Sequence, residues 1–282
     1  MRNPAGPPTT SHAIYPKANT WPSSSMPMSI DVNAMDLLPF RRDRGSLAMG
    51  IDEALLEARV EGSIGDMVRF YQFYPSAVTL GRFQRIDASV RRDVCEREGI
   101  DITRRTTGGG TVFHDAAGEI TYAVIMGIPP DLDTITRSYE RICSGLVAAL
   151  DSLGIMATFS PINDVVVGTK KISGSAQTRR KGMLLQHGTL LYKTDIEQLA
   201  RVLNVSSEKL SDKHVTSLAE RVTTIERERG TTSFEDVMDA LRSGFSSALG
   251  DLAKCELPPG VIERAHELEN AKYTNLAYIL SR

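Results

Sequence analysis

The chain has 282 residues, of which 41% are hydrophobic and 24% charged, a composition typical of globular proteins that argues against wholesale disorder. A formal net charge of −2 at pH 7 excludes a globally basic nucleic-acid-binding protein, and no apolar run reaches the roughly 18 residues that a membrane helix needs. Three widely spaced cysteines, Cys95, Cys143 and Cys255, offer no disulfide framework and predict a reducing, cytoplasmic setting. We therefore expect neither nucleic acid nor a membrane as a partner.

Residues 1–34 differ in composition from the rest of the chain. They contain six prolines and five serines, little periodicity and almost no charge, which predicts a disordered tail. They lack the basic start and the apolar stretch of a secretory signal. The remaining residues, 35–282, are numerous enough to bury a core and are expected to form one domain.

Hydrophobic periodicity and the positions of glycine and proline predict the helices and strands of this domain. A helix is expected over residues 47–61, with Ser46 as its N-cap and Gly62 at its end. Further helices are expected over residues 89–97, 134–153 and 233–249, and a last one beginning near Pro258. Strands are expected over residues 67–73, 77–81, 101–104, 111–114, 119–126, 155–159, 164–167, 171–177 and 183–193.

The clearest helical spacing of apolar residues occurs over residues 134–153. Cys143 lies on that apolar stripe, so we interpret it as a small buried hydrophobic residue and not as a nucleophile. Strands gathered in the middle of the chain, with helices at both ends, predict an α+β fold in which helices cover one face of the sheet.

Three successive glycines, Gly108, Gly109 and Gly110, follow the pair Arg104 and Arg105. Ordering three glycines costs much backbone entropy, and such a run is tolerated where the chain turns tightly or where a ligand contacts bare backbone. Backbone N–H groups in such a turn can bind an anion, and arginine side chains suit a carboxylate or a phosphate. The alternative is a glycine-rich hairpin beside two solvated arginines. The spacing fits neither the phosphate loop of nucleotide triphosphatases nor the dinucleotide-binding fingerprint.

A second polar cluster lies between residues 163 and 189. Five basic side chains face one acid between residues 163 and 187, in a chain that is otherwise balanced. Strand alternation predicts that Lys171, Ser173 and Ser175 share one face of an extended strand, where the lysine could place its charge against a phosphate or an activated carboxyl group. Gly174 within this strand indicates a close approach of backbone. A solvated surface lysine is the alternative, and Lys170 fits it.

Histidines give weaker signals. His187 is polar within an apolar run, where a core histidine satisfied by a hydrogen bond is as common as a site residue. The five histidines have no metal-ligand spacing, so the sequence leaves the presence of a metal site unknown.

Four motifs together resemble those of one known family. Residues 104–115 are similar to the RRxxGGGxVFHD signature of lipoate–protein ligases, and residues 171–176 to their KxSGSA element. Asn163-Asp164 and His187-Gly188-Thr189 resemble the ND and HGT motifs of the same catalytic domain, in the same order, over roughly residues 45–250. The resemblance implies the biotin/lipoate ligase catalytic fold, an α+β fold with a mixed, largely antiparallel sheet flanked by helices.

The resemblance also implies an activity. Lipoate and ATP, with Mg²⁺, would give lipoyl-AMP, and the lipoyl group would pass to a lysine of a lipoyl carrier domain of 2-oxoacid dehydrogenases or of the glycine-cleavage carrier protein. Lys171 would be the catalytic residue, because its ammonium group can bridge the lipoate carboxylate and the α-phosphate. Residues implied to bind the nucleotide or the acyl-adenylate are Arg105, Gly108, Gly109, Gly110, Thr111, Val112, Phe113, Asn163, Asp164, Lys171, Gly174 and Ala176. Residues implied to line the acyl pocket or to face the carrier are Arg104, His114, His187, Gly188 and Thr189.

The ligase interpretation carries one further expectation, and two alternatives to it stay open. About thirty residues follow residue 249, which resembles the short ligases whose C-terminal accessory domain is a separate small protein, so a small accessory subunit is expected. The SGSAQTR and LLQHG stretches also resemble octanoyltransferases of the same fold, which move octanoyl from acyl carrier protein to a carrier lysine without ATP. Their cysteine-dependent type needs a thiol just before the strands of the second cluster, where this chain has Thr158 and Phe159. A non-catalytic carrier-binding domain would be expected to lose Lys171 or the glycine run, and both are present.

Overall fold

The computed structural model describes residues 34–204 and 220–281. The predicted disordered tail therefore lies outside the described residues, apart from Ala34, which is the first residue of a strand. No helix in the described part of the chain is long and apolar enough to cross a membrane.

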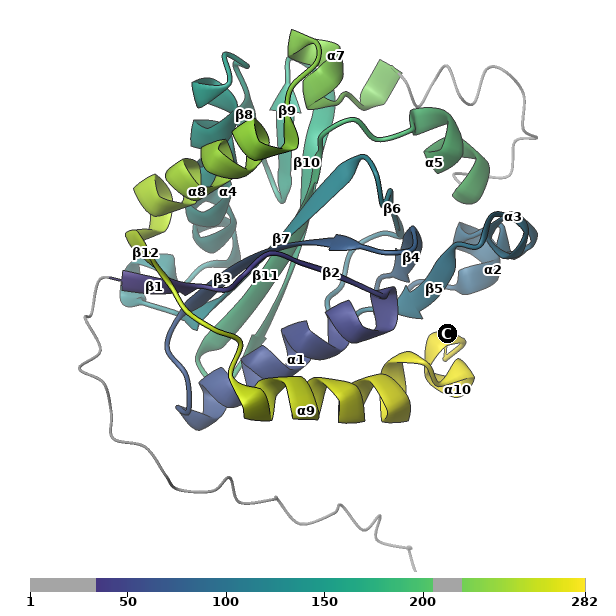
Figure 1. Cartoon of the computed structure of the whole chain (residues 1–282), viewed down its shortest axis with the longest axis horizontal. Helices are drawn as coiled ribbons and strands as arrows, with labels where there is room; N and C mark the ends of the chain where they lie inside the picture. Colours follow the sequence, from purple (N-terminus) through teal and green to yellow (C-terminus); the bar gives the residue numbers. More distant parts are fainter. Residues whose placement is uncertain (1–33, 205–219, 282) are drawn as a thin grey trace, which may run out of the picture.

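A large mixed sheet forms the centre of the molecule (Figure 1). Its strands follow the order β12-β1-β3-β7-β11-β10-β9-β8, with β2 paired to β3 beside this path. The pairs from β3 to β8 are antiparallel, whereas β1 pairs in parallel with β12 and β3. The predicted mixed, largely antiparallel sheet is confirmed. The bounds are β1 (Ala34–Leu37), β2 (Arg41–Asp43), β3 (Met67–Phe73), β7 (Glu119–Gly127), β8 (Thr158–Ser160), β9 (Asp164–Val167), β10 (Lys170–Arg180), β11 (Met183–Leu191) and β12 (Asp251–Lys254).

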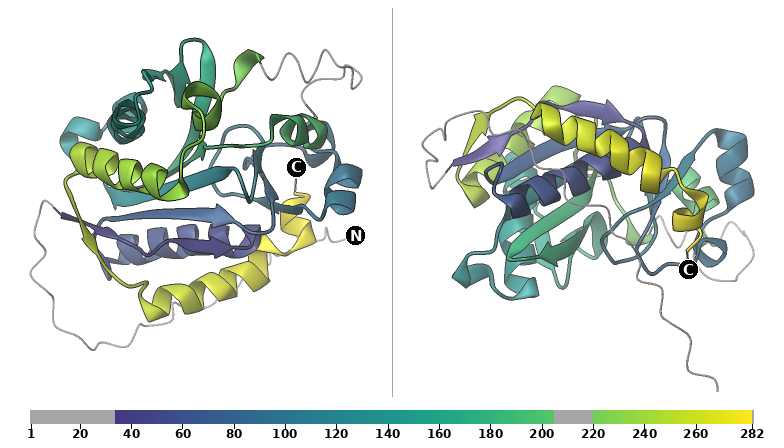
Figure 2. Two further views of the ribbon diagram at one scale, coloured as in Figure 1. Left: turned by 45° about the horizontal axis from the view of Figure 1, so that its top comes forward. Right: turned by 90° about the horizontal axis from the view of Figure 1, so that it is seen from below.

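Helices cover both faces of this sheet, so the prediction of one covered face is wrong. Strand alternation sends Tyr122 and Val124 toward α4 (Ile135–Ser152) and α8 (Phe234–Leu249), and sends Ala123 and Ile125 toward α1 (Gly45–Glu61) and α9 (Pro259–Leu268). Figure 2 shows α9 running alongside α1 on its face of the sheet. The prediction named only the start of this last helix and did not assign the helix to a face of the sheet. In the structure the apolar residues of α9 cover α1.

A smaller sheet lies beside the large one, in the order β5-β4-β6. It packs with short helices and buries a cluster of its own. Its strands are β4 (Ala77–Leu80), β5 (Asp101–Arg104) and β6 (Val112–His114), and the nearby short helices are α2 (Ile86–Ser89), α3 (Arg92–Glu98), α5 (Ile196–Val202) and α10 (Leu276–Ile279). The remaining short elements are η1 (Pro130–Leu132), α7 (Ile225–Arg229) and η2 (Glu269–Tyr273).

Helix ends agree with the sequence signals in most places. Thr134 and Ser233 cap α4 and α8 through their side chains, and Gly62 ends α1 with a φ of 75°. The expected N-cap at Ser46 is wrong: α1 begins at Gly45, two residues before the expected start, and the Ser46 hydroxyl donates to Glu269. Cys143 is fully buried in the core between the large sheet and α4, as predicted.

Arg104 is buried at the end of β5 and holds distant segments together. Its guanidinium donates to the carbonyl oxygens of Tyr278 and Ile279 in the α10 region, and to those of Gly81, Arg82 and Gln84 after β4. A buried guanidinium hydrogen-bonded to carbonyl groups of separate segments acts as a structural clamp.

Replacing Arg104 with methionine should lower the free energy of unfolding by about 2–4 kcal/mol, because several buried carbonyl groups lose a charged donor. Urea unfolding measures this loss. Arg97→Met is a matched control, since Arg97 pairs with Asp93 on the exposed surface of α3 and should leave the midpoint unchanged. Equal midpoints for the two variants would contradict the clamp.

Candidate active site

A cavity of about 250 Å³ is lined by both sheets, by the glycine run and by α1 and α5. Most of the residues that the sequence pointed to meet here. Those lining it are Arg105, Gly109, Gly110, Thr111, Val112, Phe113, His114, Asn163, Lys171, Gly174, Ala176, His187, Gly188 and Thr189. Gly108 contacts the lining residue Arg105, and Asp164 contacts the lining residue Lys171. The side chain of Arg104 points away from the cavity, toward the carbonyl groups that it binds near α10. The two clusters of the sequence thus converge on one cavity.

Arg105 organises the glycine run. Its buried guanidinium makes five hydrogen bonds to its own chain: to the hydroxyl of Thr107, to the carbonyl and hydroxyl of Thr79, and to the carbonyls of Gly108 and Gly110. Burial lowers the pKa of Arg105 to about 10, which still leaves it charged at neutral pH. The predicted contact between Arg105 and a nucleotide stays a prediction, and in this structure it would require one of these bonds to open.

Gly81, which no motif singled out, lets the glycine run pack against the end of β4. A Cβ atom built on Gly81 would lie 2.0 Å from the carbonyl oxygen of Gly109, far inside van der Waals contact. Gly109 itself has a φ of 86°, a conformation that favours glycine. Glycine at the end of a predicted strand was the available signal for this close approach.

Lys171 brings a positive charge to the cavity. Its Nζ lies 2.7 Å from Oδ1 of Asp164, and its side chain is 42% exposed. The side chain folds over Gly174, because a Cβ atom at that position would lie 2.4 Å from both Cε and Nζ. The ammonium group is therefore held between a carboxylate and bare backbone.

The predicted shared face of Lys171, Ser173 and Ser175 is wrong. The register of β10 against β9 shifts between Lys171 and Ser173, which marks a β-bulge. An extra residue reverses the alternation, so Ile172 and Ser173 are buried toward α4 while Lys171 joins Gly174 on the cavity side. Ser175 also faces α4, where its hydroxyl lies 2.8 Å from that of Tyr122.

His187 is fixed from both sides of its ring. Nδ1 lies 2.8 Å from Oδ2 of Asp52, and Nε2 lies 2.8 Å from the hydroxyl of Thr107. Asp52 in α1 is itself buried, 3.3 Å from Nη1 of Arg69, and accepts a hydrogen bond from Tyr71. This chain of polar contacts ties α1 and β11 to the glycine run. Sequence analysis missed Asp52 because it lies 135 residues from its partner.

Burial lowers the pKa of His187 from its ordinary value of 6.5, despite the hydrogen bond to Asp52. Below pH 6.5 the unfolded chain takes up a proton that the folded chain refuses, so stability should fall as the pH drops below 6.5, by at most about 1.4 kcal/mol per pH unit. Urea unfolding at several pH values measures the slope. His187→Gln should flatten it, whereas His266→Gln, at an exposed position, should not. A slope that survives His187→Gln would contradict this assignment.

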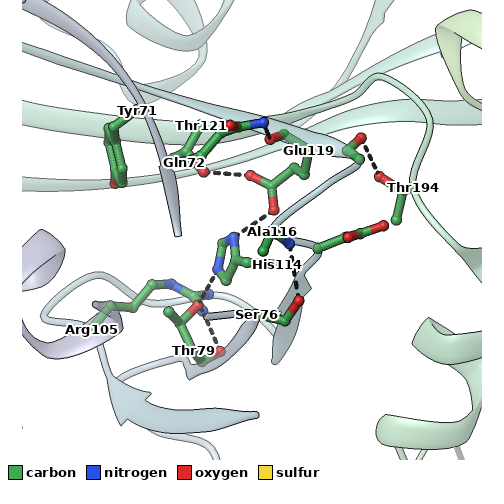
Figure 3. A network of polar contacts seen from close by, with 12 residues as sticks. Tyr71, Gln72, Ser76, Thr79, Arg105, His114, Ala116, Glu119, Thr121 and Thr194 are labelled. Carbon is green, nitrogen blue, oxygen red and sulfur yellow. Dashed lines mark hydrogen bonds and ion pairs between the residues drawn. The ribbon is translucent and has the colours of Figure 1, made fainter. Parts of the chain in front are cut away.

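A second polar network branches from Arg105 through Thr79 (Figure 3). His114 stands between the hydroxyl of Thr79, 2.9 Å from Nε2, and the carboxylate of Glu119, 2.7 Å from Nδ1. The hydroxyl of Thr121 donates to the same carboxylate. The ring of His114 stacks on Phe73, with centroids 3.9 Å apart, so it is fixed in orientation.

Much of the remaining lining is apolar and was missed by sequence analysis. Its residues lie in α1, β3, the end of β11, α5 and the residue after it, and the segment before α7, and none of them belongs to a motif. They are Met49, Tyr71, Phe73, Leu191, Leu199, Leu203 and Val222. An apolar cavity with a few fixed polar groups is typical of a small-molecule site. Among the described residues, no three His, Cys, Asp or Glu side chains converge to hold a metal ion.

Comparisons with known proteins agree with this arrangement. Residues 45–246 match the family model described as the lipoyl protein ligase A/B catalytic domain. Among curated proteins, an octanoyltransferase LipM of Lysinibacillus sphaericus is 32% identical over 81% of this chain and 92% of its own, and one of Kyrpidia tusciae is 33% identical over 84% and 93%.

Solved structures show the same fold. A bipartite lipoate protein ligase of Thermoplasma acidophilum, reported with its E2 lipoyl domain, has a TM-score of 0.79 at 31% identity and covers 88% of this chain and 96% of its own. A lipoate-protein ligase A bound with ATP has a TM-score of 0.76 at 27% identity and covers 88% and 98%.

The names of the curated relatives contradict the prediction of an ATP-dependent lipoate–protein ligase and agree with the alternative, octanoyl transfer. ATP is bound in the ligase A neighbour, so the ligase motifs alone did not distinguish the two activities. The family prediction is confirmed, since its model covers most of the chain: the protein belongs to the lipoyl protein ligase A/B catalytic-domain family.

Proposed function

We propose that this chain is an octanoyltransferase, which moves an octanoyl group from the thioester of acyl carrier protein to a lysine of a lipoyl carrier domain. The observation that carries this proposal is the match to octanoyltransferases over more than nine-tenths of their own length. A thioester is already activated, so this reaction consumes no ATP and needs no Mg²⁺. The carrier domains of 2-oxoacid dehydrogenases and of the glycine-cleavage system remain the proposed acceptors.

The cavity supports acyl transfer by its chemistry. Its apolar lining, which includes Met49, Phe73 and Leu191, suits a hydrocarbon chain, because burying apolar surface stabilises the complex by about 25 cal/mol per Å². The ammonium group of Lys171 lies in the same cavity. When an amine attacks a thioester, negative charge develops on the carbonyl oxygen, and a fixed cation beside that oxygen lowers the barrier.

We assign roles to the residues on that basis. Lys171 stabilises the oxyanion, Asp164 holds the ammonium group in place, and the glycine run lets the thioester carbonyl approach backbone. His187 and Arg105 keep the run in position. The separate accessory subunit expected from the ligase interpretation stays a prediction, and the octanoyltransferases are matched over 92–95% of their own length.

Mass spectrometry of a lipoyl carrier domain tests the proposal. One tube receives the chain with octanoyl acyl carrier protein and no ATP, and a second receives the chain with lipoate, ATP and Mg²⁺. We expect the carrier lysine to be acylated in the first tube only. Acylation in the second tube only would overturn the proposal, and no acylation in either would favour a non-catalytic carrier-binding domain.

A further inference from the structure

Asp52 does not line the cavity but is linked to it through His187, which does. Its Oδ2 lies 2.8 Å from Nδ1 of His187, and its Oδ1 lies 3.3 Å from Nη1 of Arg69. Asp52 and Arg69 are both buried, and neither belongs to the cavity lining. Any effect of Asp52 on acyl transfer must therefore pass through the residues that it contacts.

The contacts of the His187 ring fix the position of its proton. An ionised carboxylate can only accept hydrogen bonds, so the Nδ1 atom that faces Asp52 carries the proton. Burial lowers the pKa of His187 despite the hydrogen bond to Asp52, and the ring is therefore neutral at neutral pH. A neutral imidazole with its proton on Nδ1 has a bare Nε2, which accepts a hydrogen bond from the hydroxyl of Thr107, 2.8 Å away.

This direction of hydrogen bonding reaches the glycine run. The Thr107 hydroxyl gives its proton to His187, so its oxygen is open to Nε of Arg105, which donates to it at 3.0 Å. Nη2 of the same guanidinium donates to the carbonyls of Gly108 and Gly110, at 2.7 and 2.6 Å. In a trans peptide the N–H points opposite to the carbonyl, so Arg105 also sets the direction of the next N–H groups along the run.

The same order of groups recurs at Nη1 of Arg105 (Figure 3). That nitrogen donates to the hydroxyl of Thr79, 3.2 Å away, which lies 2.9 Å from Nε2 of His114. Nδ1 of His114 in turn lies 2.7 Å from the carboxylate of Glu119. The guanidinium is thus oriented at two of its nitrogens by a hydroxyl, an imidazole and a carboxylate in series.

We propose that Asp52 is a positioning residue for acyl transfer, which acts by holding the proton of His187 on Nδ1. With the proton there, the Thr107 oxygen accepts from Arg105, and the guanidinium keeps the glycine run in the orientation that receives the thioester carbonyl. The role in transfer rests on the proposed octanoyltransferase function, whereas the position of the proton is independent of it.

Asp52→Asn should move this proton, because Arg69 selects the orientation of the new amide. The position of Oδ1 faces Nη1 of Arg69, which is a donor, so the amide oxygen stays there. The amide nitrogen then faces Nδ1 of His187 and donates to it, and the ring proton shifts to Nε2. The Thr107 oxygen now faces two donors, that Nε2 and Nε of Arg105, while its own buried hydroxyl proton loses its acceptor.

Nitrogen NMR of the labelled histidine rings tests the position of the proton. For His187 we expect a protonated Nδ1 and a bare Nε2 in the parent chain, and the reverse in Asp52→Asn; His187→Gln identifies the signals by their loss. Asp43→Asn is the matched control, since Asp43 is another buried carboxylate, 4.0 Å from Arg69, and should leave the ring unchanged. A proton on Nε2 of the parent ring would overturn the inference, whether or not the variants fold. An unchanged ring in folded Asp52→Asn would do the same.

Steady-state kinetics of octanoyl transfer tests the effect on the reaction. Asp52→Asn should lower kcat by about 10- to 100-fold and leave KM for the donor carrier within about threefold, because a displaced group slows the reaction without weakening the docking of the carrier. Asp43→Asn should keep the kcat of the parent chain. Thr107→Val should lower kcat as Asp52→Asn does, and the double variant should be no slower, because both changes interrupt one chain of contacts.

Equal losses of kcat in Asp52→Asn and Asp43→Asn would show a general effect of removing a buried carboxylate and would overturn the inference. So would an unchanged kcat in Asp52→Asn once NMR shows that the proton has moved. A parent chain that transfers no octanoyl group overturns the proposed function and with it the role of Asp52 in transfer, whereas the NMR result stands by itself.

Discussion

Replacing Lys171 with alanine should lower kcat for octanoyl transfer by about 100- to 1000-fold, the usual loss when one preorganised oxyanion donor is removed. The ammonium group is held by Asp164 at 2.7 Å and lies in the cavity that we assign to the thioester. The fold should be unaffected, because the side chain is partly exposed and no core residue depends on it. The rate of carrier acylation, measured by mass spectrometry at saturating substrate concentrations, gives kcat.

The neighbouring lysine provides the matched control for this variant. Lys170 is exposed and belongs to the same strand, so Lys170→Ala removes the same charge from the same end of β10. We expect its activity to stay within about twofold of the parent chain. Equal activities for Lys171→Ala and Lys170→Ala would remove Lys171 from the reaction.

Replacing Gly174 with alanine should lower kcat by about 100-fold, since a displacement of about 1 Å in a catalytic group can cost that much. The added Cβ atom would lie 2.4 Å from Cε and Nζ of Lys171 and 3.4 Å from Oδ1 of Asp164, so the ammonium group must move. The thermal midpoint should change little, because the displaced atoms are the end of a flexible, partly exposed side chain. Activity and thermal unfolding, measured together, separate the two effects.

A double variant shows whether Gly174 acts through Lys171. If it does, Lys171→Ala with Gly174→Ala should be as slow as Lys171→Ala alone, because the two changes remove one interaction. Gly65→Ala is the control for adding a methyl group, since its Cβ would make only an ordinary contact, 3.6 Å from Asp36. Additive losses in the double variant would argue for a separate role of Gly174.

The contiguous parts of the site could be predicted from the sequence. The glycine run with Arg105 is local, so the sequence shows its unusual backbone and charge directly. Lys171 and His187 stood out as polar residues in otherwise apolar or balanced stretches. The two residues also lie close together in the structure, because β10 and β11 are adjacent strands and Ala176 pairs with His187.

Other parts depend on contacts between distant segments. Asp52 sits in an apolar helix whose spacing says nothing about a histidine on β11, and Val222 enters the cavity wall through a bridge to Lys171. The bulge in β10 breaks the alternation on which side-chain direction was predicted. The sequence motifs also could not show whether ATP or a thioester supplies the activated acyl group, because both kinds of enzyme share these motifs.

The bulge between Lys171 and Ser173 sets a rule for insertions and deletions in β10. Removing one residue between Lys171 and Gly174 would leave a regular ladder of backbone hydrogen bonds with the lysine still on the cavity side. Adding one residue while the bulge is kept would instead point the lysine into the hydrocarbon layer under α4. An unpaired ammonium group there costs several kcal/mol. Chain length at this point is therefore constrained by charge, because a strand shorter by one residue keeps the lysine in the cavity and a strand longer by one residue does not.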